Sequence, residues 1–517
     1  MATKVYTKVG VVQGTHKDSI NIFKGIPYAQ PPLNELRWRP PQPPLLWDGV
    51  LDATKFGRTS WSYLVGDDNS NADEDCLNLN IWTPSTDANA RLPVMVYIHE
   101  GGFVFGSGSN AYLDGQRLAQ QGVVVVTFNY RLGALGFLAL TELDEEGSTS
   151  GMFGIQDQQA ALGWVQTHIS SFGGDPNNVT VFGESAGAHA IGILMVSAGS
   201  AGLFHKAILQ SGGFWNQVLG HDMDFDRARE HGKRVWNRLG VSNIAELRKV
   251  PPRRLVEAFP CDLSGPPDIL NFAPSIDRNV LPDKGLRLFM RNEQMQIPVL
   301  AGITIDEGTL FKGMLPAYST AKEWELIGKA ISGSERYAEF LSHYPTDFSG
   351  TPLPESISNF IGDLYLAHQT WKVAICQAAA GVENVYMYVF SYTSAYSPLP
   401  LHATDINFTF GTIDQPLFYK PHVVEYSEAD RKISDAMITY WRNFAKFADP
   451  NGRGIDGLPT WPRYQGKEGD VMGLGTEISP TLLQFERLKF VDSLYTDDYL
   501  RREWLDLASQ SAGKRQQ

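Results

Sequence analysis

A serine flanked by glycines stands where an apolar run meets a helix-forming run. Ser185 is the centre of the pentapeptide 183–187, Gly-Glu-Ser-Ala-Gly. It follows residues 178–182, Asn-Val-Thr-Val-Phe, a run rich in β-branched and aromatic residues. A serine on a sharp strand-to-helix turn is held out at the edge of a sheet, and the two glycines let the strand and the helix approach closely. This pattern predicts a nucleophilic serine that forms an acyl-enzyme.

Acyl transfer also needs donors for the negative charge that develops on the carbonyl oxygen. His99-Glu100-Gly101-Gly102 follows an apolar run, and glycine lets a backbone turn its N–H groups toward a charge without side-chain obstruction. An isolated Gly-Gly pair is more typical of a simple turn. The serine turn of 183–187, which we call the nucleophile elbow, lies downstream. We therefore expect the N–H groups of Gly101, Gly102 and Ala186 to form an oxyanion hole.

The elements that would position these groups alternate between strands and helices. Residues 92–99 and 122–128 are almost continuously apolar, as in strands that are covered on both faces of a parallel sheet. Residues 157–169 show helical spacing and precede the elbow. This order predicts a doubly wound α/β fold. Farther on, Ser427 is expected to cap a long helix that ends near Phe447.

Composition limits the classes of protein and partner. The chain has 517 residues, 43% of them hydrophobic, without a recognisable linker or repeat, so we expect a single domain over 1–517. The formal net charge of −13 and the lack of a basic run argue against nucleic acid or a membrane surface as partner. No apolar segment is typical of a signal peptide or a membrane span. Cys76, Cys261 and Cys376 are too few and too widely spaced for a disulfide framework or a metal site. These features predict a soluble, cytoplasmic chain with buried thiols.

Nine short motifs, taken together, carry a family resemblance. In order they are Gly25-Ile26-Pro27-Tyr28-Ala29, Glu74-Asp75-Cys76-Leu77-Asn78-Leu79-Asn80-Ile81, the loop that starts at His99, Asn129-Tyr130-Arg131-Leu132-Gly133, Gly173-Gly174-Asp175-Pro176, the elbow, Gln210-Ser211-Gly212, Asp306-Glu307-Gly308 and His402-Ala403-Thr404-Asp405. With these motifs the chain resembles the type-B carboxylesterase and lipase family of α/β hydrolases, whose relatives include the cholinesterases. The resemblance implies an α/β-hydrolase fold, in which helices and long loop and helical insertions flank a large, mostly parallel central sheet.

The resemblance also implies the rest of a catalytic triad. It assigns the acid to Glu307 and the base to His402, and the chain order Ser185, Glu307, His402 is that of α/β hydrolases. Without the resemblance, the sequence does not single out one histidine of eleven. His189, four residues after the serine, is the local alternative, although the elbow projects Ser185 away from the helix that carries it.

Three features depart from the family pattern. Glu100 occupies the first of three places that usually hold glycine, and we expect its carboxylate to face away from the oxyanion and to anchor the loop. No cysteine precedes Cys76, so the upstream disulfide of secreted relatives cannot form. The Trp-Asn-Pro signature of cholinesterases is missing, and Trp61 is out of register with it, which argues against choline esters. Glu74 and Arg131 resemble a buried acid–arginine pair of the family.

The sequence thus predicts a serine carboxylic-ester hydrolase that needs no metal or organic cofactor. An H-E-x-x-H zinc motif fails because Phe103 stands where its second histidine is needed. Phe103, Phe214 and Trp215 are candidates for an apolar acyl pocket that would favour small to medium, uncharged esters, although such aromatics equally suit the core. Two alternatives stay open: transesterification, lactone or cyclisation chemistry with the same triad, and a non-catalytic interaction protein. No motif in the sequence indicates the oligomeric state.

Overall fold

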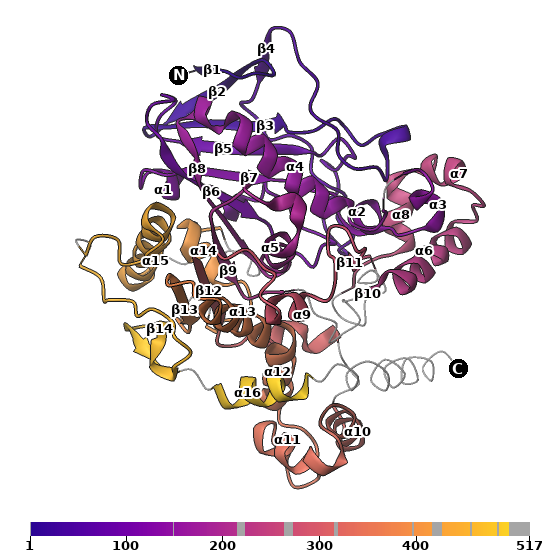
Figure 1. Ribbon diagram of the computed structural model, residues 1–517, viewed down its shortest axis with the longest axis vertical. Helices are drawn as coiled ribbons and strands as arrows, with labels where there is room; N and C mark the ends of the chain where they lie inside the picture. The colour runs from indigo at the N-terminus through magenta and orange to yellow at the C-terminus, as the bar shows by residue number, and fades with distance from the viewer. Residues whose placement is uncertain are drawn as a thin grey trace.

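A computed structural model describes the fold over most of the chain (Figure 1). The described residues are 2–147, 149–214, 223–262, 272–314, 319–394, 398–415, 426–454, 457–482 and 485–495. Within these ranges, thirteen strands form one sheet, and two short strands, β10 (Met223–Asp224) and β11 (Ser275–Ile276), pair separately.

The large sheet is parallel through its centre and antiparallel at its margins, except that the short strand β4 (Val50–Asp52) pairs in parallel with its neighbour. Its order is β1 (Ala2–Tyr6), β2 (Val11–Lys17), β3 (Ile20–Pro27), β5 (Asn78–Thr83), β7 (Val124–Phe128), β6 (Leu92–Ile98), β8 (Gly174–Glu184), β9 (Lys206–Gln210), β12 (Val299–Thr304), β13 (Val385–Phe390), β14 (Val471–Leu474) and β15 (Ile478–Thr481), with β4 (Val50–Asp52) beside β2. Every pair from β7 to β14 is parallel. Because the carboxyl ends of these strands share one edge, the loops that follow them meet there.

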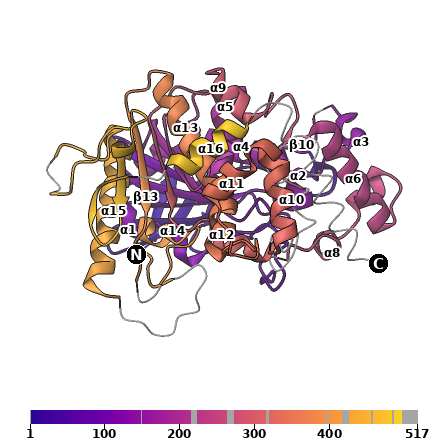
Figure 2. The ribbon, with the colours of Figure 1, turned by 90° about the horizontal axis from the view of Figure 1, so that it is seen from below.

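Helices cover both faces of the sheet (Figure 2). Along β6, Val94, Val96 and Ile98 join one buried cluster, while Met95 and Tyr97 join another on the opposite face. The first cluster includes α4 (Phe153–His168), α5 (Ala186–Val196) and α13 (His368–Ala379). The second includes α14 (Asp405–Phe410) and α15 (Glu428–Phe447). The mostly parallel α/β-hydrolase architecture expected from the sequence is therefore confirmed.

The remaining helices lie around the sheet and the helices already named. They are α1 (Gln116–Ala119), α2 (Gly133–Phe137), α3 (Thr141–Asp144), α6 (Phe225–Leu239), α7 (Ile244–Arg248), α8 (Pro252–Ala258), α9 (Gly285–Met290), α10 (Ala321–Ser332), α11 (Tyr337–His343), α12 (Pro354–Gly362) and α16 (Phe485–Leu494). A π-helical turn, η9 (Asp363–Ala367), joins α12 to α13. Helices α10 to α12 and α16 share a smaller core around Trp324, Phe340 and Phe490, away from the sheet (Figure 1).

The elements expected from the sequence are present, with shifted ends. The helix predicted over 157–169 is α4, which begins four residues earlier. Ser427 caps α15 in a capping box with Asp430, and the helix ends at Phe447 as expected. The three cysteines, Cys76, Cys261 and Cys376, are all buried and free. The secondary structure that the sequence predicted around the elbow is confirmed.

Glycine at position 187 sets how closely α5 lies against the sheet. A Cβ at Gly187 would overlap the carbonyl oxygen of Ile98 at the end of β6, whereas a Cβ at Gly163 of α4 would meet nothing within 4 Å. We expect Gly187→Ala to lower the free energy of unfolding by about 1–3 kcal/mol, because backbone must move to admit the methyl group. Gly163→Ala, also inside a helix, is expected to raise it by about 0.5–1 kcal/mol. Thermal or urea unfolding of both variants measures the difference, and an unchanged stability for Gly187→Ala would contradict this packing.

Candidate active site

Ser185 lies on a strained turn between a strand and a helix. It separates β8 from α5, and its backbone has φ 53° and ψ −120°, a region that residues with a side chain rarely adopt. The Ser185 N–H donates to the carbonyl oxygen of Gln210, 2.9 Å away at the end of β9. The turn is thus fixed to the neighbouring strand, and the side chain is only half-buried. This is the geometry predicted for the elbow.

Glu307 and His402 form a short, buried contact. The distance from His402 Nδ1 to Glu307 Oε2 is 2.6 Å, and both side chains are less than 5% exposed. The other oxygen of Glu307 accepts the hydroxyl of Ser211 at 2.6 Å and the backbone N–H of Thr304 at 2.7 Å. Donors thus surround the carboxylate, which stabilises its charged form and fixes its orientation toward the imidazole.

Backbone contacts also hold the segments that carry Glu307 and His402 side by side. Asp306, just after β12, pairs with Leu401 in an isolated bridge, and the His402 N–H donates to the Asp306 carbonyl oxygen at 3.1 Å. Helix α12 supports the same turn, because the Ser358 hydroxyl donates to Asp306 at 2.7 Å. A Cβ at Gly308 would overlap the carbonyl oxygen of Ser358, so a larger residue does not fit there.

The second nitrogen of His402 faces the elbow. Nε2 lies 3.2 Å from Oε1 of Glu184, the residue directly before Ser185. Burial raises the pKa of Glu184 well above its usual range, and the charges of Asp405, Glu100 and Glu307 raise it further. The structure therefore brings Ser185, Glu307 and His402 to one edge of the sheet, with an extra carboxyl group beside the imidazole.

The loop after β6, where the oxyanion hole is expected, has three successive residues with a left-handed backbone. Gly101, Gly102 and Phe103 have φ values of 108°, 61° and 64°, and the N–H groups of Val104 and Phe105 both donate to the Gly101 carbonyl oxygen. A Cβ at Gly101 would overlap the carbonyl oxygen of Phe105. Glycine is thus required at this position.

The third expected donor, Ala186, is the first residue of α5. The N–H groups of a helix's first turn have no partner within the helix and carry the positive end of its dipole. They are therefore suited to receive a developing negative charge at the elbow.

Two tyrosines hold Glu100, the unusual residue of this loop. One carboxylate oxygen accepts the Tyr97 hydroxyl at 2.8 Å, and the other accepts the Tyr112 hydroxyl in a short hydrogen bond. Asn110 donates to the Tyr112 hydroxyl in turn. The expectation that Glu100 anchors its loop agrees with these contacts.

The aromatic residues that the sequence suggested for an acyl pocket are Phe103, Phe214 and Trp215. Phe103 is fully buried against Phe137, and Phe214 is fully buried near Phe289 and His368. Both side chains belong to the large buried cluster on one face of the sheet, which is the alternative that the sequence left open. Trp215 lies outside the described residues.

An aromatic residue that the sequence did not single out lies against the histidine. The Phe311 ring is tilted over the His402 imidazole with 5.1 Å between ring centroids, and it stacks on Tyr365 at 6.4 Å. Its position four residues after Glu307 is the one signal in the sequence that could have indicated it. His189, the alternative base, lies on α5, where its Nδ1 accepts the Gly213 N–H at 3.4 Å.

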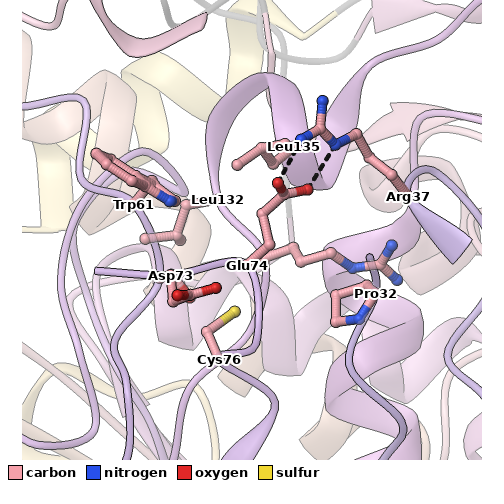
Figure 3. A pocket seen from close by; sticks show the side chains of 10 residues that line it. Pro32, Arg37, Trp61, Asp73, Glu74, Cys76, Leu132 and Leu135 are labelled. Atoms are coloured by element: carbon pink, nitrogen blue, oxygen red, sulfur yellow. Dashed lines mark hydrogen bonds and ion pairs between the residues drawn. The ribbon is translucent and has the colours of Figure 1, made fainter. Parts of the chain in front are cut away.

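The buried ion pairs behind the site differ from the predicted pairing. Glu74 does not pair with Arg131; it pairs with Arg37 through two hydrogen bonds (Figure 3). Arg37 also donates to the Val250 carbonyl oxygen. Arg131 pairs instead with Asp157 of α4, at 2.7 and 2.8 Å. The expected pairing failed because both arginines line the same cavity of about 10 Å³, and sequence order does not say which acid each one meets.

The described part of the chain contains no group of three or more His, Cys, Asp or Glu side chains that could hold a metal ion.

Comparison with known proteins identifies the family. The carboxylesterase family matches residues 1–491. The chain belongs to the carboxylesterase family. It is 34% identical to para-nitrobenzyl esterase of Bacillus subtilis (strain 168), over 92% of this chain and 95% of that protein. It is 33% identical to bile salt-activated lipase of Mus musculus, over 94% of this chain and 86% of that protein.

Solved structures agree with the sequence relatives. A PNB esterase structure superposes with a TM-score of 0.79 at 30% identity, covering 95% of this chain and all of that one. Carboxylesterase EST55 of Geobacillus stearothermophilus gives 0.80 at 31% identity, covering 95% of this chain and 99% of that one. The resemblance predicted from the nine motifs is confirmed, and this carboxylesterase is a serine ester hydrolase.

The ion pair between Arg131 and Asp157 joins the segment after β7 to α4 in this carboxylesterase. The Asp157 side chain is fully buried and also accepts the Arg131 backbone N–H at 3.1 Å. We expect Asp157→Asn to lower the free energy of unfolding by about 3–5 kcal/mol, because it leaves a buried guanidinium without a counter-charge.

A surface pair provides the matched control. Arg253 and Glu257 lie 2.9 Å apart on α8 with both side chains more than half exposed. Glu257→Gln is expected to change the stability by less than about 0.5 kcal/mol. Chemical denaturation of both variants measures the difference, and equal effects would show that the buried pair contributes no more than an exposed one.

Proposed function

We propose that this carboxylesterase hydrolyses esters through an acyl-enzyme on Ser185, with His402 as the general base and Glu307 as the acid that orients it. The observation that carries the proposal is the 2.6 Å contact between Glu307 and His402 Nδ1, which leaves Nε2 on the side of the elbow. With Nδ1–H donating to Glu307, the tautomer is fixed so that Nε2 carries the lone pair that accepts a proton.

In the acylation half-reaction, Ser185 Oγ attacks the ester carbonyl carbon as His402 Nε2 takes the hydroxyl proton. The carbonyl oxygen becomes an oxyanion, and the N–H groups of Gly101, Gly102 and Ala186 stabilise it in a site whose backbone is already in place. When the tetrahedral intermediate collapses, the bond to the alcohol breaks, and the imidazolium returns its proton to the leaving oxygen.

Deacylation repeats these steps with water as the nucleophile. Water gives a proton to His402 Nε2 as its oxygen attacks the acyl carbon. The tetrahedral intermediate then collapses, the bond to Ser185 Oγ breaks, and the imidazolium returns the proton to Oγ as the carboxylic acid leaves. Glu307 keeps its negative charge throughout and stabilises the imidazolium of each step, because Ser211 and the Thr304 backbone hold the carboxylate in position. No step needs a metal or an organic cofactor.

The substrates we propose are small to medium, uncharged, hydrophobic esters. Phe311 supplies an apolar surface directly beside the imidazole, and carboxyl groups rather than cations surround the site, which disfavours anionic substrates. The name of the para-nitrobenzyl esterase relative also points to a neutral ester. The alternatives of acyl transfer, lactone or cyclisation chemistry, and of a non-catalytic interaction protein, are not favoured by the esterase relatives.

We further propose that the chain acts as one domain in the cytoplasm and needs no nucleic-acid or membrane partner. Three free, buried cysteines support a reducing compartment. Among the described helices, none has both the length and the apolar character to cross a bilayer.

The decisive test is labelling of Ser185 together with burst kinetics on p-nitrophenyl esters. Wild-type protein is expected to release a burst of p-nitrophenol that matches the enzyme concentration, and to gain one covalent organophosphonate adduct detectable by mass spectrometry. Ser185→Ala is expected to lose both, with residual activity reduced by about 10³-fold or more, because the nucleophile is gone.

Two histidine variants separate the proposed base from the local alternative. His402→Gln is expected to abolish the burst and the adduct, whereas His189→Gln, which changes a residue on the core side of α5, is expected to retain the adduct. A folded His402→Gln enzyme that still formed the adduct at the wild-type rate would remove His402 from the mechanism.

A further inference from the structure

The two loop N–H groups expected in the oxyanion hole belong to successive peptide units. The Gly101 N–H shares a plane with the carbonyl group of Glu100, and the Gly102 N–H shares one with the carbonyl group of Gly101. No peptide bond in the described ranges is cis, so each N–H points away from the carbonyl oxygen of its own unit. A contact that holds the carbonyl oxygen therefore also sets the direction of the N–H.

Different groups hold the two carbonyl oxygens. That of Gly101 accepts the N–H groups of Val104 and Phe105, each at 3.0 Å, within the same tight turn. That of Glu100 receives no backbone N–H among the described residues. Its partner is the imidazole of His99, whose Nδ1 lies 2.8 Å away. The direction of the Gly101 N–H thus depends on a side chain, whereas that of the next N–H does not.

The hydrogen bond to Glu100 fixes the tautomer of His99. A carbonyl oxygen can only accept, so Nδ1 carries the hydrogen. Burial lowers the pKa of the imidazole, which favours its neutral form, although the charge of Glu100 and the hydrogen bond act in the opposite direction. Nε2 is buried and receives no hydrogen bond within the described ranges. In that part of the chain, the imidazole therefore makes its only hydrogen bond to the Glu100 carbonyl oxygen.

Neighbouring residues hold the imidazole in place. Its ring stacks on that of Tyr130, with 4.3 Å between centroids and 19° between planes, and the Tyr130 hydroxyl donates to the His99 carbonyl oxygen at 3.1 Å. A Cβ at Gly106 would lie 2.6 Å from both the His99 Nδ1 and the Glu100 carbonyl oxygen. His99 and Tyr130 are both fully buried. The donor therefore has little freedom to leave its acceptor.

The side chain of Glu100 is held separately from its carbonyl oxygen. The two tyrosines described above bind its carboxylate, and the carbonyl oxygen of one of them, Tyr112, accepts the Thr412 hydroxyl at 2.6 Å. A peptide unit can still turn over between fixed Cα atoms, and glycine at 101 permits the alternative dihedral angles. The bond from His99 opposes such a turn, which would direct a carbonyl oxygen instead of an N–H toward the oxyanion.

The loop leaves the sheet beside the elbow. In the pairing of β6 with β8, the last residue of β6 lies opposite Gly183 of the elbow. A Cβ at Gly187 would lie 3.2 Å from the His99 carbonyl oxygen, so the start of the loop packs on the first turn of α5. The Gly101 N–H donates to no acceptor among the described residues. It is thus available for a charge that develops beside the nucleophile.

We propose that His99 is a positioning residue: by holding the Glu100 carbonyl oxygen, its Nδ1–H keeps the Gly101 N–H directed toward the oxyanion that forms on the substrate. This inference rests on the proposed function. The negative charge develops in the transition state and is absent from the bound ester. Loss of the His99 hydrogen bond is therefore expected to lower kcat and to leave KM nearly unchanged.

The test compares two replacements of nearly equal shape. The amide nitrogen of His99→Asn can donate from close to the place of Nδ1, whereas His99→Leu offers no donor. With p-nitrophenyl butyrate, His99→Leu is expected to lower kcat by about 10- to 100-fold, with KM within about twofold of wild type. His99→Asn is expected to keep kcat within about threefold of wild type, because the donor is retained. If the imidazole served packing alone, both variants would lose activity alike.

A trifluoromethyl ketone measures the oxyanion hole directly. Ser185 Oγ adds to its carbonyl carbon as the hydroxyl proton passes to His402, and the ketone oxygen becomes an oxyanion. The inhibition constant is expected to rise in His99→Leu by about the factor by which kcat/KM falls.

Another buried histidine provides the matched control. The His168 ring packs on that of Trp164, with 4.9 Å between centroids, at the end of α4. It precedes the start of β8, whereas Ser185 follows the end of that strand, so it lies at the opposite edge of the sheet. His168→Leu is expected to keep kcat within about twofold of wild type.

Three results would overturn the proposal. They are a folded His99→Leu enzyme with kcat within about threefold of wild type, equal losses of kcat in the two His99 variants, and a change confined to KM. Thermal unfolding of each variant verifies the fold. If His99→Leu does not fold, His99→Phe, which keeps a ring against Tyr130 but offers no donor, replaces it in the comparison. If neither folds, a loss of kcat by more than about tenfold in His99→Asn is the overturning result. Failure of the proposed function would instead appear as a missing organophosphonate adduct on wild-type protein.

Discussion

The contact between His402 Nδ1 and Glu307 Oε2 joins two residues that are 95 positions apart, and the rest of the site depends on it. A parallel sheet makes this possible because the segments that follow β12 and β13 leave the same edge. The bridge between Asp306 and Leu401 then fixes the backbone, so the two side chains meet with little freedom left to lose. The relative position of Glu307 and His402 is therefore set mainly by backbone pairing at the edge of the sheet.

Burying the carboxyl groups of this site is electrostatically unfavourable, and the hydrogen-bond donors around most of them offset the loss of hydration. Two donors besides the imidazole hold Glu307, two phenols hold Glu100, and a phenol and an amide hold Asp405. A low-dielectric site strengthens each of these hydrogen bonds and penalises each group that lacks them. Four acids therefore lie close to one imidazole, and three of them have hydrogen-bond donors of their own.

The sequence predicted best those features that local chemistry determines. The strand, turn and helix around Ser185 were predictable because glycine spacing and an apolar run describe that turn, and Ser427 marked the start of α15 because a capping box is local. The assignments of Glu307 and His402 came only through the family resemblance, since no local rule links two residues so far apart.

Features that depend on packing were not predictable. Arg37 rather than Arg131 meets Glu74, because two arginines and two acids share one small region and only the folded chain decides the pairing. Phe103 and Phe214 lie in the core, while Phe311 lies on the imidazole, since an aromatic residue's position in the sequence does not say which way its ring points. Glu184 stands within the most informative motif of the chain, yet its surroundings include acids from three other segments, which no local pattern indicates.

The close fit of α12 against the Glu307 turn has a consequence for how this enzyme responds to heat. A Cβ at Gly362 would lie 2.9 Å from the Glu307 Cβ, so the end of α12 rests directly on the residue that orients His402. The same helix belongs to the small core of α10, α11 and α16, which is separate from the two large clusters on the sheet. Cooperative units of a protein open at different free energies. If the small core loosens first, the imidazole loses its support while the sheet is still folded, so loss of turnover on heating would precede the melting of the domain as a whole.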